Sequence, residues 1–217
     1  MLPLAEAQAA LTDAEQVLTR WTSQAAERAK AADLLAAELA EQEARAGDDL
    51  AASDDPETDL AAIADRLQRL RTEQQLAVQA ADSARTRLGD ARRAMLPAMV
   101  EVLRSRAKEL RDAATARQAR TDQMVAELAA WERVEYGPVP RRSTVGDGHT
   151  WRSVPLTERV TERATWLANH ADHLAYLAAN GEPDQVLSAV TAGLPEVVDV
   201  ERVALGIPDP VLADATA

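Results

Sequence analysis

The amino-acid sequence predicts an all-α protein, in which a long antiparallel coiled-coil helical hairpin continues through a proline kink into a smaller helical bundle. Residues that interrupt helices are rare in the first two thirds of the 217 residues. Residues 4–45 contain no glycine or proline, and residues 57–136 contain only Gly89 and Pro97. Apolar residues recur every seven positions through both stretches, and acidic and basic residues occupy separate blocks. These observations together predict the fold class.

The first predicted helix covers residues 4–45 and carries six heptads. One series of residues repeats at a strict spacing of seven, and a second series lies three positions after it. Six consecutive heptads are typical of a coiled-coil seam rather than of a surface helix. The two series are Leu4, Leu11, Leu18, Ala25, Ala32 and Leu39, and Ala7, Ala14, Trp21, Arg28, Leu35 and Gln42.

The second predicted helix follows an acidic turn at about residues 47–57, and the run Asp54-Asp55-Pro56-Glu57 is a helix-start signal. A proline inside a helix removes a backbone hydrogen bond, so Pro97 predicts a kink at residues 93–97. The heptad also slips by one position there. Before the slip the seam is Leu60, Leu67, Gln74, Ala81, Leu88, Met95 and Val102, with Ile63, Leu70, Ala77, Ala84, Ala91 and Ala98; after it the seam is Leu103, Leu110, Arg117, Met124 and Trp131, with Ala107, Ala114 and Leu128.

The distribution of charge predicts that these helices pair in opposite directions. Residues 1–65 hold 15 acidic and 4 basic residues, whereas residues 66–120 hold 13 basic and 6 acidic ones. Opposite charges then flank one seam in a hairpin. With a turn centred near residue 52, Leu39 faces residues 63–67 and Leu4 faces the region of Pro97. We therefore predict two domains, a hairpin over residues 1–97 and a bundle over residues 98–217.

Shorter elements are expected in the last third, where most of the glycines and prolines lie. A helix from Pro155 to Asn180 should pack against residues 98–135, and short helices should follow at 183–192 and 195–205. An irregular loop is expected at 137–154, and an extended arm after Pro208. The predicted apolar face of the first of these helices is Leu156, Val160, Ala164, Leu167, Ala171, Leu174 and Ala178.

The high alanine content predicts that the hairpin does not stand alone. The chain has 47 alanines, and many occupy seam positions. A buried methyl group contributes about 0.8 kcal/mol, against about 1.5–3 kcal/mol for a buried leucine. An alanine seam is therefore weak, and we expect a further helix against it, from this chain or from another copy.

Several classes of function are excluded or unsupported. The chain has no cysteine, which rules out disulfides, thiolate nucleophiles and cysteine-ligated metals. No signal peptide or membrane-spanning segment is visible. The sequence also lacks a nucleophile elbow, a phosphate-binding glycine loop and a dinucleotide fingerprint. We expect a non-enzymatic protein without a cofactor or a metal, located in the cytoplasm or within a phage particle.

The loop at 137–154 is one candidate binding element. A connection this long is uncommon between packed helices unless it binds something or forms its own small element. Arginine and tryptophan are residues that anchor interfaces. The alternative is a surface loop with no binding role. The candidate interface residues are Arg141, Arg142, His149, Trp151 and Arg152.

The arginine-rich stretch from residue 85 to residue 120 is a second candidate, as a face for an anionic partner such as nucleic acid. Arginine suits phosphate recognition, but the acidic first helix could neutralise the same face internally. No aromatic residue is interleaved to stack a base. Internal pairing is therefore the favoured interpretation. The candidate residues are Arg92, Arg93, Arg104, Arg106 and Arg111.

His170 and His173 are the third candidate pair, because their spacing could place two imidazoles on one metal ion. No ExxH pair or HExxH motif accompanies them, so packing at the edge of the apolar face is the simpler interpretation. A helical metalloenzyme at this pair is the third functional alternative.

We expect a structural or interaction protein, acting as a coiled-coil component or adaptor of a larger multi-subunit assembly. Its partners would be other protein subunits, either copies of itself or different chains, with nucleic acid as the alternative and no membrane. The 22 arginines and only 2 lysines are typical of GC-rich coding. An actinobacterium or one of its phages is therefore the expected source, and a virion protein the narrower expectation.

Overall fold

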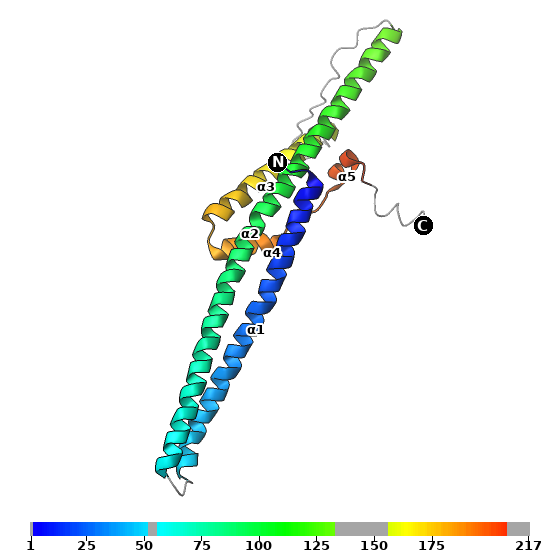
Figure 1. Cartoon of the computed structure of the whole chain (residues 1–217). Helices are drawn as coiled ribbons and strands as arrows, with labels where there is room; N and C mark the ends of the chain where they lie inside the picture. Colours follow the sequence, from blue (N-terminus) through cyan, green and yellow to red (C-terminus); the bar gives the residue numbers. More distant parts are fainter. Residues whose placement is uncertain (1, 52–55, 133–155, 208–217) are drawn as a thin grey trace, which may run out of the picture. The chain divides into compact units, whose positions relative to one another are not determined.

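The computed structural model describes residues 2–51, 56–132 and 156–207, and within these it contains five helices and no strand. They are α1 (Leu4–Ala51), α2 (Pro56–Glu132), α3 (Leu156–Asn180), α4 (Pro183–Ala192) and α5 (Asp199–Leu205) (Figure 1). The all-α class is confirmed, with two long helices that pack closely followed by a smaller helical bundle.

Packing divides the chain into two compact units. The hairpin unit is Thr12–Met95, and the bundle unit is Met1–Leu11 together with Leu96–Ala217. Residues 2–11 thus pack with the bundle unit. The predicted division into a hairpin domain over residues 1–97 and a bundle domain over residues 98–217 stays a prediction.

In the hairpin unit, α1 and α2 lie side by side and run in opposite directions (Figure 1). The buried residues occupy the predicted seam, whereas Arg28, also a predicted seam residue, is exposed, as expected for a charged group. Arg71 bonds to Glu43 at 2.8 Å, and the Arg87 guanidinium lies 5.0 Å from the Trp21 ring centroid. The buried side chains are Ala25, Ala32, Ala81, Ala84, Ala91 and Met95.

The connection between the two long helices is shorter than predicted. α1 continues through Gly47 to Ala51, although residues 47–51 were expected to belong to the turn. One glycine costs a helix only about 1 kcal/mol, which packing along a 48-residue helix can outweigh. The register differs accordingly: Trp21 faces Arg87, a few residues farther along α2 than a turn centred on residue 52 predicts.

In the bundle unit, α2 is buried over a wider face than in the hairpin unit. Pro97 lies inside α2 without ending it. Just beyond it, residues of both heptad series are buried, including Val102 and Leu103 at 2% and 0% exposure. The slip in the heptad therefore marks the place where α2 becomes covered on two sides. The buried residues of α2 here are Leu96, Met99, Val100, Val102, Leu103, Ser105, Arg106, Ala107, Leu110 and Ala114.

The predicted inner face of α3 is confirmed from Val160 to Leu174, whereas Leu156 and Ala178 at its two ends are only half-buried. The side chains of Val160, Ala164, Leu167, Ala171 and Leu174 are all buried, as is Leu177 one turn later. α3 ends before Gly181, where a Cβ atom would lie 2.6 Å from the Leu177 carbonyl oxygen, so only glycine fits without movement.

The two short helices partly follow prediction. α4 has the expected bounds. α5 begins at Asp199 rather than at residue 195, because Val198 is still extended, with φ −92° and ψ 163°. Gly206 ends α5 in the left-handed conformation, at φ 68° and ψ 23°. The predicted loop at 137–154 and the predicted arm after Pro208 lie outside the described residues.

Candidate interaction site

The last part of α2 is solvent-exposed along its whole length. From residue 115 to residue 131, all of which the structure describes, no side chain is buried. One turn earlier, Leu110 and Ala114 are only 0% and 8% exposed. We call residues 115–132 the terminal segment of α2. The predicted packing of this segment against the helix at 155–180 is therefore wrong beyond Ala114.

Three large apolar side chains of this segment form one stripe. Met124, Leu128 and Trp131 are 59%, 45% and 81% exposed, and they are spaced four and three residues apart. These spacings place them on one face of a helix. The same face carries the buried seam residues Leu103 and Leu110, at multiples of seven from Met124. We call Met124, Leu128 and Trp131 the exposed stripe.

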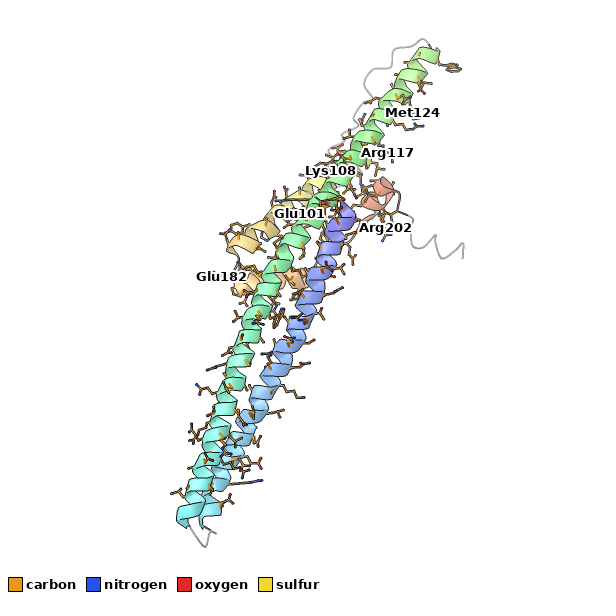
Figure 2. All side chains as sticks on the ribbon, viewed as in Figure 1. Glu101, Lys108, Arg117, Met124, Glu182 and Arg202 are labelled. Atoms are coloured by element: carbon orange, nitrogen blue, oxygen red, sulfur yellow. The ribbon has the colours of Figure 1, made fainter. Side chains whose placement is uncertain are left out.

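Figure 2 shows Arg117 and Met124 along the terminal segment, with no other described helix running beside Met124. The stripe is thus the continuation of a seam that is covered as far as Ala114 and uncovered beyond it, among the described residues.

Periodicity distinguishes this stripe from the exposed apolar residues of the hairpin unit. Those residues are Val17, Leu34, Leu60, Leu76 and Val78. No two of them on one helix are three, four or seven positions apart, so they do not form a face. Single exposed apolar side chains are normal on protein surfaces, whereas a contiguous apolar face indicates an interaction.

Charged residues flank the stripe unequally along its length. Arg117, Arg120 and Asp122 precede it, whereas Glu127 lies within it. Gln118 donates a hydrogen bond to Asp122 at 2.8 Å, and Gln123 donates one to Glu127 at 2.7 Å. No carboxylate of the described residues pairs with Arg117 or Arg120. The segment is therefore basic at its start and acidic later.

The bundle unit also contains a buried charge cluster that the sequence did not reveal. Glu201, on α5, is fully buried and forms ion pairs with Arg106 of α2 and Arg163 of α3. Arg106 also donates to the Pro195 carbonyl at 3.2 Å, and Arg163 to the Glu196 carbonyl at 3.1 Å. The cluster joins three helices and the segment before α5.

One sequence signal pointed to this part of the chain. Glu201 lies among Val197, Val198, Val200 and Val203, which mark a largely apolar environment, but Asp199 lies in the same run, so the pattern does not single out Glu201. Its partners could not be read from the sequence, because Arg163 and Arg106 lie 38 and 95 residues away along the chain.

The five arginines predicted to face an anionic partner do not form one exposed row. Arg106 is buried against Glu201, and Arg104 pairs with Asp172 at 3.1 Å. Arg92 is half-buried, whereas Arg93 and Arg111 are exposed. Arg104 and Arg106 thus pair within the chain, but their partners lie on α3 and α5 and not on the acidic first helix that was expected to neutralise this face. Binding of an anionic partner by the other three stays a prediction.

His170 and His173 line an open hollow of about 460 Å³ between α3 and α4. The His170 ring stacks on Trp166, with centroids 5.4 Å apart, and the Arg163 guanidinium lies 4.1 Å from the Trp166 ring centroid. Partial burial lowers the pKa of His170, and the charges of His173 and Arg163 lower it further. Within the described residues, no third histidine or carboxylate completes a metal-binding group with this pair.

The candidate loop residues Arg141, Arg142, His149, Trp151 and Arg152 lie outside the described residues, so their role stays a prediction. In the part of the chain that is described, no helix is both long enough and apolar enough to cross a membrane. No protein-family model matches the chain, and neither the curated proteins nor the solved structures contain a match.

Proposed function

We propose that the chain is a non-enzymatic structural or interaction protein, a coiled-coil component or adaptor of a larger multi-subunit assembly. The observation that supports this proposal is the exposed stripe. A heptad seam that is buried as far as Ala114 continues through Met124, Leu128 and Trp131 with no described helix over it.

The chemistry of the stripe fits a helical partner. Residues spaced four and three apart form the narrow face that a second helix covers in a coiled coil. Covering one large apolar side chain contributes about 1.5–3 kcal/mol before the costs of association, so three of them supply a useful driving force. Tryptophan is also enriched among the residues that dominate binding energy at interfaces.

Two alternatives are less well supported. A nucleic-acid-binding role would draw on an arginine row in which Arg104 and Arg106 are already paired with carboxylates of the same chain. A metalloenzyme would need more ligands than His170 and His173. A virion component is the narrower form of our proposal, and its support is the arginine-rich, lysine-poor composition.

Photocrosslinking in the source cells tests the proposal. A benzophenone amino acid in place of Leu128 reports what lies on the stripe. The same group in place of the exposed Ala126 is the matched control, because residue 126 lies on the opposite face of the helix. We expect a discrete intermolecular protein adduct from position 128 and much less from position 126.

Adducts that join position 128 to a specific protein, whether a second copy or a different chain, support the proposal. If neither position gives an intermolecular adduct, or both give the same diffuse set, the stripe is not an assembly contact and the proposal fails.

A further inference from the structure

We infer that the partner on the exposed stripe is a second copy of this chain, bound antiparallel through residues 117–131. This inference rests on the proposed function, since it requires that the stripe binds a helix. It adds the identity and the direction of that helix, and both follow from the charges that flank the stripe.

The positions of Arg120 and Glu127 carry the argument. They are seven residues apart and therefore lie on the same flank of the stripe. When two identical helices pair antiparallel, equal flanks of the two helices face each other. Arg120 of each copy can then meet Glu127 of the other, which forms two equivalent ion pairs. In a parallel pair this flank faces the opposite flank of the second helix, and Arg120 meets Val125 instead.

The same register also places the seam residues of the two copies opposite each other. It sets Thr121 of each copy against Met124 of the other, and Arg117 against Leu128. The aliphatic stem of an arginine can cover a leucine while its guanidinium stays in water. Trp131 then lies at the outer end of the paired region, beside the exposed residues Thr115 and Ala116.

The pairing closes on itself. An antiparallel pair has a two-fold axis, so each copy uses the same surface and no second stripe is left open. Arg117 and Arg120 have no carboxylate partner among the described residues. In this arrangement the helix of the second copy lies beside both of them.

Sedimentation equilibrium of the full chain tests the inference, with Arg120→Glu, Glu127→Arg and the double variant that exchanges the two charges. Both positions carry exposed side chains, so we expect unchanged helix content by circular dichroism in all three variants. The 23.4 kDa wild-type chain should dimerise with a Kd between about 1 and 100 µM.

Each single variant should raise the dimer Kd at least about tenfold, because two attractive pairs become repulsive. The double variant should recover the wild-type Kd, because the exchanged charges at positions 120 and 127 attract each other again across the two copies. Added salt should weaken the wild-type dimer and strengthen the dimers of the single variants.

A chain that stays monomeric at 100 µM overturns the inference. The stripe would then be covered by a different protein or by another segment of the same chain. A dimer whose Kd is unaffected by the single charge changes also overturns it. Crosslinking at Leu128 separates the two proposals: an adduct with a different protein, together with a monomeric chain, contradicts the second copy and leaves the assembly role supported.

Discussion

Glu201 is fully buried, and its carboxylate lies against two arginines of different helices, Arg106 and Arg163. Removing a charge from water is costly, and the ion pairs with their additional carbonyl contacts offset that cost. Taking away only the central charge would leave Arg106 buried without a counter-ion. The cluster is therefore the place in the bundle unit where a single-atom change should matter most.

We expect Glu201→Gln to lower the free energy of unfolding of the bundle unit by about 3 kcal/mol. Glu196→Gln is the matched control, because Glu196 is exposed and contacts Arg163 only through its backbone carbonyl. Urea unfolding followed by circular dichroism measures both. A loss below about 0.5 kcal/mol for Glu201→Gln would contradict the buried ion pairs.

His170 should titrate below the ordinary histidine pKa of about 6.5, since burial and then the charges of His173 and Arg163 disfavour its protonated form. Folding therefore favours neutral His170. Its contribution to stability is complete above the unfolded-state pKa and is lost as the pH falls through the lowered folded-state pKa. Proton NMR of the imidazole resonances measures the midpoint, and His170→Gln identifies the signal. A midpoint at or above 6.5 would contradict the packing of His170 against Trp166.

At the scale of elements, the hairpin unit depends on small side chains. Ala84 is 1% exposed, and Ala25, Ala32 and Ala81 are also buried, so α1 and α2 approach closely along this seam. A closely packed seam has little space for additional carbon atoms. Each alanine of this seam therefore buries little apolar surface, and the close approach of the helices leaves little room for a larger side chain at the same position.

We expect Ala84→Leu to lower the free energy of unfolding by about 1–3 kcal/mol through overpacking. Ala94→Leu makes the same chemical change on an exposed position of the same unit, and it should change stability by less than about 0.5 kcal/mol. Thermal unfolding followed by circular dichroism compares the two variants. Equal effects would show that the seam at Ala84 is not tightly packed.

The long elements could be predicted because heptads and the absence of breakers are local signals. The inner faces of α1 and α3 follow from spacing alone, and the Asn180-Gly181 stop of α3 follows from residue type. Spacing does not reveal which part of a seam is covered. Leu110 and Met124 share one heptad series, yet they are 0% and 59% exposed, a difference that the spacing does not contain.

Charge patterning was similarly informative in part. It predicted the antiparallel pairing of α1 and α2, which Glu43 and Arg71 illustrate. It could not single out Arg106, whose partner Glu201 lies on a seven-residue helix near the end of the chain. Pairing over such a separation depends on the tertiary fold.

At the scale of the whole molecule, the net charge of −12 is unevenly distributed along the chain. The basic residues of 66–120 balance the acidic first helix where the two helices pair. The terminal segment of α2 has a similar division on a smaller scale, with basic residues first and acidic residues after them. A second copy in the opposite direction would bring its basic and acidic ends together. Association would then depend on the stripe and its flanks, while each unit keeps its own core.

Replacing Leu128 by lysine should therefore abolish the dimer without lowering the free energy of unfolding of the monomer. Leu128 is 45% exposed, so the lysine ammonium can stay in water in a single chain, but it would lie inside the proposed seam. Sedimentation equilibrium and urea unfolding provide the two measurements. A substantial loss of monomer stability would mean that Leu128 is covered by its own chain.

Distances between spin labels test the antiparallel second copy most directly, and the absence of native cysteine makes single-cysteine variants clean. Gln123→Cys and Ala130→Cys place labels seven residues apart at equivalent positions on the helix. In the proposed register the two labels at residue 123 lie nearly level along the helix axis, whereas those at residue 130 are offset by about 20 Å. We predict a clearly longer distance between labels at residue 130 than at residue 123. Equal distances at the two sites would mean parallel pairing, and the absence of any intermolecular distance would mean no second copy; either result would contradict the account.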